Sequence, residues 1–191
     1  MTKKRRALNY VYLGGIVVGG LCVASILGPH LFPKIDLGMD LPNKFAAPSH
    51  MHWLGLDQNG SDLLLKLLFG ARVSLMVSLA VVALSLLLGM AIGSIAGWRG
   101  GWTDQVIMRG IDMLYAFPGF LLALATVAML GPSTRNLIIA LCLTGWTSFA
   151  RLVRAELLHI KHREFILSST ALGASSLRLI VKHCWPNLLG P

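Results

Sequence analysis

The segment Val73–Trp98 most constrains what this chain can fold into, because it runs for 26 residues without a charged side chain. Twelve of its residues up to Gly97 are Leu, Ile or Val, and each favours insertion into a bilayer by about 0.3 to 0.6 kcal/mol. The run also exceeds the roughly 20 residues that a helix needs to cross the hydrocarbon core. The sequence therefore predicts a membrane protein with a span over about residues 73–97.

A first span is expected earlier in the chain, over Ala7–Gly28. This stretch is apolar and lies in a region without charge between Arg6 and Lys34. A basic start followed by an apolar run is also typical of a cleaved signal peptide. The run is longer than the apolar region of such a peptide, and Ala24–Ile26 is a poor cleavage context, which favours a retained helix.

Two further spans follow the central one. Met113–Thr134 is uncharged for 22 residues and predicts a helix over about 110–131, kinked where Phe117, Pro118 and Gly119 occur together. The next apolar run, Asn136–Ala150, is short for a span. Its helix is expected to continue to about residue 156, with nearby arginines reaching the membrane surface.

The composition agrees with this interpretation, since 55% of the residues are hydrophobic and only 13% are charged. We predict an all-α, polytopic transmembrane bundle with a basic start and first span at 1–28, an outer segment at 29–72 and a core at 73–191. Gly89, Gly93 and Gly97 recur every four residues, a pattern that allows a second helix to approach closely within a membrane.

The positions of the basic residues predict the orientation. If the spans alternate, 12 of the 17 Lys and Arg residues fall on the side of the amino terminus and 5 fall on the other side. Basic residues concentrate on cytoplasmic flanks, so the amino terminus is expected in the cytoplasm. The charge of +9 is placed between apolar runs, which favours contact with membrane lipid and argues against a nucleic-acid partner.

We expect no enzyme activity from this chain. It contains no G-x-x-x-x-G-K-[ST], G-x-S-x-G or H-E-x-x-H pattern, so no catalytic residues and no bound cofactor are predicted. The predicted span cores contain no Asp, Glu, Lys, Arg or His, the groups that carry protons or coupling ions in secondary transporters. Energy for any transport is expected to come from outside the chain.

Metal binding is the weaker interpretation of the histidines, and no metal site is predicted. An H-x-H without carboxylates suits a loop, an i,i+3 His pair on a basic stretch suits a solvated face, and adjacent His and Cys side chains diverge. The cysteines show no metal-ligand spacing and are interpreted as packing residues. The residues concerned are His50 and His52 with His30 and Met39, His159 with His162, His183 beside Cys184, and the cysteines Cys22, Cys142 and Cys184.

Residues 157–187 are predicted to form a helix-turn-helix on the cytoplasmic side. A basic amphipathic helix is expected to end near Phe165, small residues run from Ser168 to Ser176, and a second helix follows. Gly173 permits a positive φ, and Ser175 or Ser176 is placed to cap the second helix. Such a helix suits a groove on a soluble partner, and the alternative is a helix that lies on anionic lipid.

This segment resembles the inner-membrane permease subunits of ABC importers, in the dipeptide, oligopeptide and nickel group. The family signature is E-A-A, three residues, G, nine residues, then a hydrophobic or His position followed by x-L-P, and Gly173, His183 and Pro186 fall at those spacings. Five more patterns occur in the family's order between His52 and Pro191. They are Leu54-Gly55-Leu56-Asp57 with Gly60-Ser61-Asp62, Gly70-Ala71-Arg72-Val73-Ser74, Gly100-Gly101-Trp102-Thr103-Asp104, Met108-Arg109 with Asp112, and Ala116-Phe117-Pro118.

The resemblance implies a subunit of the bacterial inner membrane that passes peptides or a related small solute. It implies that Phe165–Ser176 docks on a cytoplasmic ATPase subunit, which binds ATP and Mg and drives the fourth span. It also implies a second, similar permease subunit and a periplasmic solute-binding protein that faces His52–Arg72. The residues expected at the ATPase coupling loop are Phe165, Ser168, Ser169, Ala171, Leu172, Gly173, Ala174, Ser175, His183 and Pro186.

Two departures from the family pattern leave alternatives open. Leu167-Ser168-Ser169 stand where the family has E-A-A, so the acidic residue that would meet a basic group on the ATPase is replaced. Family members have two more spans after the Pro186 region, so we expect a fragment or a truncated and inactive subunit. The competing interpretations are a membrane scaffold without transport, and a self-contained channel or secondary transporter.

Overall fold

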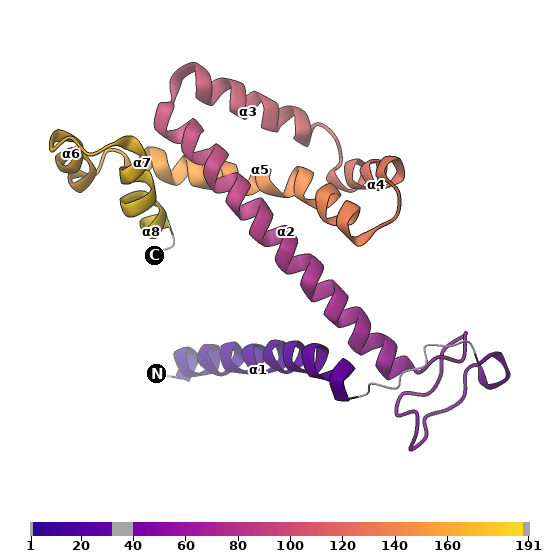
Figure 1. The fold of residues 1–191 in the computed structure, drawn as a ribbon. Coiled ribbons are helices and arrows are strands. Elements are labelled where there is room, and N and C mark those ends of the chain that lie inside the picture. Colours follow the sequence, from indigo (N-terminus) through magenta and orange to yellow (C-terminus); the bar gives the residue numbers. More distant parts are fainter. Residues whose placement is uncertain (1, 32–39, 189–191) are drawn as a thin grey trace. The chain divides into compact units, whose positions relative to one another are not determined.

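The computed structural model describes residues 2–31 and 40–188, and the regular structure in these ranges is helical apart from one isolated bridge between Leu56 and Asp62 (Figure 1). The all-α class predicted from the sequence is confirmed. The chain divides into two compact units, Met1–Ser78 and Leu79–Pro191, and the division falls within helix α2 (Leu63–Arg99). Each unit is described separately below.

The first unit holds helix α1 (Thr2–Leu31), the short 3-10 helix η1 (Leu41–Asn43) and the start of α2. Helix α1 covers the expected first span, and its apolar part is Tyr12–Gly28. The span expected to begin at about residue 73 begins earlier in the structure, because α2 runs unbroken from Leu63. Chain between 63 and 99 contains no proline to stop it, and the Asp62 carboxylate accepts the Leu65 N–H at 3.2 Å, as an N-terminal cap does.

The second unit is built around helix α5 (Thr134–Ile160), which lies beside helix α4 (Gly119–Leu130) and contacts helix α3 (Gly101–Tyr115) (Figure 1). The corner between α4 and α5 is closed by hydrogen bonds. Ser133 Oγ accepts the N–H of Asn136 at 3.1 Å, and the Asn136 amide donates to the carbonyls of Leu130 at 2.8 Å and Gly131 at 2.9 Å. These contacts satisfy backbone groups that both helix ends would otherwise leave open.

The expected span over 110–131 is not a single helix. Helix α3 ends at Tyr115, α4 begins at Gly119, and their axes differ by 82°. Pro118 explains the break, because proline has no N–H to donate and disfavours helical geometry in the residue before it. The sequence therefore placed the kink correctly, but the span expected as one kinked helix is two helices.

The carboxyl-terminal half of α2 crosses α5 at its glycines. A Cβ at Gly93 would lie 2.5 Å from the carbonyl oxygen of Ala150, and a Cβ at Gly89 would lie 2.4 Å from Cβ of Phe149. A Cβ at Gly97 would lie 3.0 Å from Cβ of Leu157. Only hydrogen fits at the two closer positions, so the backbones of α2 and α5 touch directly there.

After α5 the chain forms short helices packed on the end of α5. They are α6 (Glu164–Ala171), α7 (Ser176–Leu179), the π-helical turn η2 (Ile180–Cys184) and α8 (Trp185–Leu188). Five side chains from α5, α6 and η2 form a buried apolar cluster here: Val153, Leu157, Ile160, Ile166 and Cys184. This cluster fixes α6 and η2 to the end of α5.

Within the described residues, two helices are long and apolar enough to cross a membrane, namely α2 and α5. The bent pair of α3 and α4 provides a third crossing if it is counted as one broken span. The apolar part of α1, Tyr12–Gly28, is shorter than these helices. The four expected spans thus correspond to two long helices, one broken pair and one shorter apolar helix.

Candidate functional site

A cavity of about 280 Å³ lies at the break between α3 and α4, against the middle of α5. Its wall combines hydroxyl groups, aromatic rings and two glycines that leave backbone uncovered. The lining residues are Leu114, Tyr115, Phe117, Gly119, Thr144, Gly145, Thr147 and Ser148. We call it the hydroxyl cavity. Two sequence signals point to it, the Phe117-Pro118-Gly119 break and the polar stretch of α5, but the sequence alone did not bring them together.

The tyrosine of this cavity is held from two sides. Tyr115 Oη and Ser148 Oγ are 2.8 Å apart, so one hydroxyl donates a hydrogen bond to the other. The guanidinium of Arg151 lies over the Tyr115 ring, 4.5 Å from its centroid, and Arg151 is itself paired with Asp112. Thr147 Oγ1 donates to the Thr144 carbonyl at 2.5 Å and is buried. The hydroxyl cavity therefore has a wall in which the aromatic ring is oriented by its neighbours.

Two ion pairs join α3 to α5. Arg154 binds both carboxylate oxygens of Asp104 through its Nε and Nη2 atoms, and Arg151 binds Asp112. The first pair is the less exposed one, with side chains 32% and 14% exposed. Sequence reasoning expected the arginines to reach the membrane surface alone and missed both pairs. The available signal was the presence of two acidic residues on α3 and of two arginines close together near the end of α5.

The end of α5 is fastened to the end of α2. Lys161 Nζ donates to the Trp98 carbonyl at 2.7 Å and lies 5.7 Å from the centroid of the Trp98 ring. The lysine thus provides a hydrogen-bond donor for a carbonyl that the last turn of α2 leaves unpaired. The basic helix ends at Ile160, five residues before the expected end near Phe165.

The α6–α7 turn, residues 172–175, is closed by a glycine in the left-handed region. Gly173 has φ +83°, its N–H donates to the Thr170 carbonyl at 2.9 Å, and the Ala174 N–H donates to the Ser169 carbonyl at 3.1 Å. This pair of bonds is the Schellman arrangement that ends a helix at a glycine. Leu172 at the turn and Leu177 on α7 are 89% and 72% exposed. The turn thus presents apolar side chains outward while its base is buried.

The ten residues predicted for the coupling loop fall into two groups. Eight lie on α6 and the α6–α7 turn: Phe165, Ser168, Ser169, Ala171, Leu172, Gly173, Ala174 and Ser175. The other two, His183 and Pro186, lie on η2 and α8. Ser175 occupies the N-cap position of α7, but its side chain makes no capping hydrogen bond. Cys184 beside His183 is buried, which raises the pKa of its thiol above the ordinary value of 9.0.

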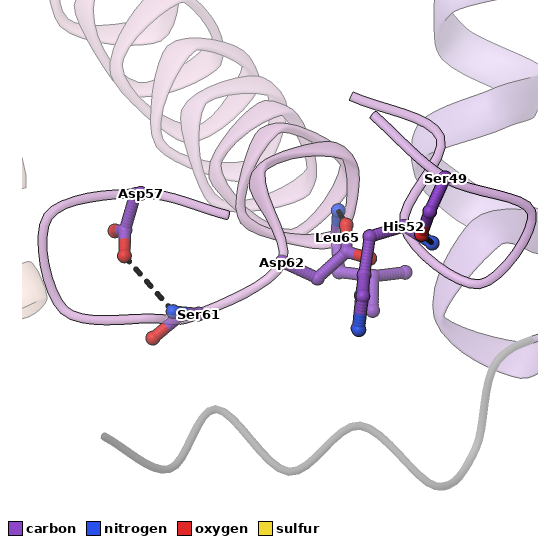
Figure 2. A network of polar contacts seen from close by, with 6 residues as sticks. All are labelled: Ser49, His52, Asp57, Ser61, Asp62 and Leu65. Atoms are coloured by element: carbon purple, nitrogen blue, oxygen red, sulfur yellow. Dashed lines mark hydrogen bonds and ion pairs between the residues drawn. The ribbon is translucent and has the colours of Figure 1, made fainter. Parts of the chain in front are cut away.

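Residues 40–62 form a lobe held by polar contacts (Figure 2). His52 Nδ1 lies 2.9 Å from Asp62 Oδ2, and Ser49 Oγ accepts the His52 N–H at 3.1 Å. Asp57 Oδ1 accepts the Ser61 N–H at 2.9 Å, and the other carboxylate oxygen binds Lys66. The bonded Lys66 ammonium lowers the pKa of the Asp57 carboxyl below 3.8. The side chain of His52 therefore contributes a contact that holds the lobe together.

Among the residues that the structure describes, no three His, Cys, Asp or Glu side chains lie close enough to hold a metal ion. Two members of the outer cluster considered above, Met39 and the side chain of His30, lie outside what the structure describes.

Comparison with known proteins identifies the fold family. Residues 89–191, more than half of the chain, match the family described as binding-protein-dependent transport system inner membrane component. The chain belongs to this family. Two similar relatives are from Bacillus subtilis: the dipeptide transport system permease protein, 36% identical over 98% of this chain, and the oligopeptide transport system permease protein, 37% identical over 97%. The nickel transport system permease protein of Escherichia coli is 37% identical over 91% of this chain.

The family assignment makes the chain a membrane protein and confirms the resemblance predicted from its motifs. The relatives are transport permeases. The chain spans 59%, 61% and 62% of the lengths of the three relatives above. Both the hydroxyl cavity and the α6–α7 turn lie within the part that matches the family.

Proposed function

We propose that this chain is a transmembrane permease subunit of an ATP-driven importer for peptides or a related small solute. The observation that carries the proposal is the α6–α7 turn, which exposes Leu172 and Leu177 while Ile166 and Cys184 fix its base to α5. An exposed apolar turn on a buried base suits a groove on a partner protein. The family assignment supports the ATPase of a binding-protein-dependent importer as that partner.

The partners follow from the family and remain part of the proposal. They are cytoplasmic ATPase subunits, which bind ATP and Mg, a second similar permease subunit and a periplasmic solute-binding protein. This chain itself binds no cofactor in the proposed mechanism. The Glu of the family signature is replaced by Leu167, which is exposed on α6, so contact with the ATPase would rest on apolar packing.

Movement of the turn would reach the solute pathway through α5. When ATP favours the closed ATPase pair, the turn and the end of α5 would move together because one buried cluster joins them. The ion pairs of Arg151 and Arg154 would transmit the motion to α3. ATP would thus shift the population between outward-facing and inward-facing states through its different affinity for them.

Copurification tests docking through the turn. The chain is coexpressed with the ATPase of its importer, and the recovered ATPase is compared for wild type, Leu172→Glu and Gly173→Ala. We expect recovery to fall at least about tenfold for Leu172→Glu, because a carboxylate would be buried without a partner. Gly131→Ala is the matched control, since Gly131 also has a positive φ, +90°, with no atom within 4 Å of a Cβ there. Equal recovery for all variants would show that the turn is not the docking site.

The proposed orientation places the amino terminus in the cytoplasm and the chain in the bacterial inner membrane. If α3 and α4 form one broken span, the lobe and the α6–α7 turn end on opposite sides of the membrane. If they form a re-entrant loop, both lie on the same side. The broken span and the re-entrant loop are distinguished by labelling with a membrane-impermeant thiol reagent. The labelled positions are Met51→Cys and Leu172→Cys, each in a chain without its own cysteines. Labelling of both thiols from the outside would refute the proposed topology.

A further inference from the structure

The hydroxyl cavity lies beside the middle of α5, one of the two helices that are long and apolar enough to cross a membrane. Gly145 is 11 residues from the start of α5 and Ser148 is 12 residues from its end. At about 1.5 Å per residue these separations are roughly 16 Å and 18 Å. Half of a hydrocarbon core about 30 Å thick is close to both values. If α5 crosses the membrane along its whole length, this polar wall lies deep in the hydrocarbon core, where water or a solute can contact it.

The break in the α3–α4 pair creates the cavity. Because the chain bends by 82° after Tyr115, α4 does not continue the line of α3, and Gly119 faces Thr144 of α5. Interrupted helices that line a cavity at membrane depth are the places where transporters bind their solutes. The break is therefore the part of the spans best placed to contact a passing solute.

The chemistry of the wall matches a peptide group. Such a group carries one N–H donor and one carbonyl acceptor, and a hydroxyl group both donates and accepts. The bond between Tyr115 and Ser148 uses one of their two O–H donors, and lone pairs on their oxygens remain as acceptors for an N–H of a solute. Leu114 and Phe117 supply apolar surface beside them for a side chain.

The volume sets the size of the bound part. At about 30 Å³ for each water-sized group, a cavity of 280 Å³ holds about nine non-hydrogen atoms. That is the size of one peptide group with a small residue on each side. A longer peptide would place one peptide group here at a time.

We propose that the hydroxyl cavity is a solute-contact site in which Tyr115 and Ser148 bind the peptide group of the transported solute. This deepens the proposed function and rests on it. Arg151 acts as a positioning residue, since it holds the Tyr115 ring and its own charge is paired with Asp112.

Transport of two matched probes tests the assignment. Glycylglycine and glycylsarcosine differ by one methyl group, which replaces the peptide N–H. Uptake is measured in proteoliposomes that contain the complete importer. The kcat/KM of glycylglycine is divided by the kcat/KM of glycylsarcosine, and this quotient is the ratio compared between variants. The solute-binding protein also discriminates, but it is the same in every sample and cancels when variants are compared with wild type.

We expect Tyr115→Phe and Ser148→Ala to lower this ratio by about two- to tenfold, the effect of one neutral hydrogen bond. Thr126→Ala is the control, because its hydroxyl donates to Leu122 within α4 at 2.7 Å and does not line the cavity. Its ratio should equal that of wild type. A fall in uptake of both probes by the same factor would show a structural role only and would overturn the assignment.

Failure of the proposed function has a different result. If the wild-type importer takes up neither probe, the proposed function fails and the assignment falls with it. If it takes up glycylglycine but both variants keep the wild-type ratio, the assignment alone is wrong.

A variant that does not fold is replaced by Ser148→Cys in a chain without other cysteines. Labelling of its introduced thiol should slow at least about threefold with glycylglycine present, and absence of labelling or of protection would overturn the assignment.

Discussion

Gly93→Ala measures how much the direct contact between α2 and α5 stabilises the fold. The added Cβ would lie 2.5 Å from the Ala150 carbonyl oxygen and 3.0 Å from Ala150 Cα. Both are backbone atoms, so no side-chain rotation relieves the clash. Since unstrained carbon contacts are about 3.5 to 4.0 Å, the helices would have to separate by somewhat less than about 1 Å. A gap of that size forfeits a quarter to a half of each neighbouring contact.

The expected loss in the free energy of unfolding is about 1 to 3 kcal/mol, the range for overpacking of a close interface. Two buried cysteines of the same unit, Cys142 and Cys184, report unfolding when they react with a dye that fluoresces on binding a thiol. The assay uses a Cys22→Ser background, because Cys22 is only half-buried. Each kcal/mol should lower the midpoint temperature by about 2 to 4 °C.

Gly110→Ala is the matched control, since it makes the same change in helix α3. A Cβ at Gly110 would have no atom within 4 Å, so alanine should stabilise the helix by about 0.5 to 1 kcal/mol. Gly97→Ala should lie between the two, because its nearest atoms are 3.0 to 3.3 Å away. If Gly93→Ala unfolds at the same temperature as Gly110→Ala, the inferred contact between the helix backbones is wrong.

Three further perturbations have expected outcomes. Arg154→Gln should lower the midpoint in the same dye assay more than Arg151→Gln does, because Arg154 and its partner are the less exposed pair and an exposed pair contributes only about 0 to 1 kcal/mol. Ser94→Ala should cost about 1 kcal/mol by removing the acceptor 3.0 Å from the α8 indole N–H. The pKa of Asp57 lies below 3.8, so its stabilisation of the lobe is present above pH 3.8 and is lost as the pH falls through the folded-state value. Amide exchange of residues 57–61, corrected for the intrinsic rate, should accelerate on acidification in wild type and not in Asp57→Asn.

Each of these has a result that contradicts it. Equal midpoints for the two arginine variants would show that exposure does not govern the ion pairs. A Ser94→Ala variant as stable as wild type would mean that the indole finds another acceptor. An acid-induced acceleration that persists in Asp57→Asn would assign the pH dependence to a different group.

The local features of the fold were predictable from the sequence. Hydrophobic runs and the absence of charge located α2 and α5, and the proline at position 118 located the break, because both signals act within a few residues. The family motifs predicted the family that residues 89–191 match. The side of the membrane on which the α6–α7 turn lies stays a prediction.

The pairings between distant segments were not predictable in the same way. Asp104 and Arg154 are 50 residues apart, and nothing in their local sequence selects one acidic residue over another. The 82° angle of the bend was not predictable, because a proline sets where a helix stops, whereas the packing of α4 on α5 sets where the chain goes next.

By itself the sequence determined that this chain is helical, belongs in a membrane and carries a glycine-closed turn after its last long helix, because composition, periodicity and turn chemistry are local properties. Only the tertiary structure decided which glycines meet which backbone atoms, which charges pair, and that the broken span and α5 together line a cavity. These features depend on the distance between side chains that are far apart in the chain, and that distance exists only once the helices have packed.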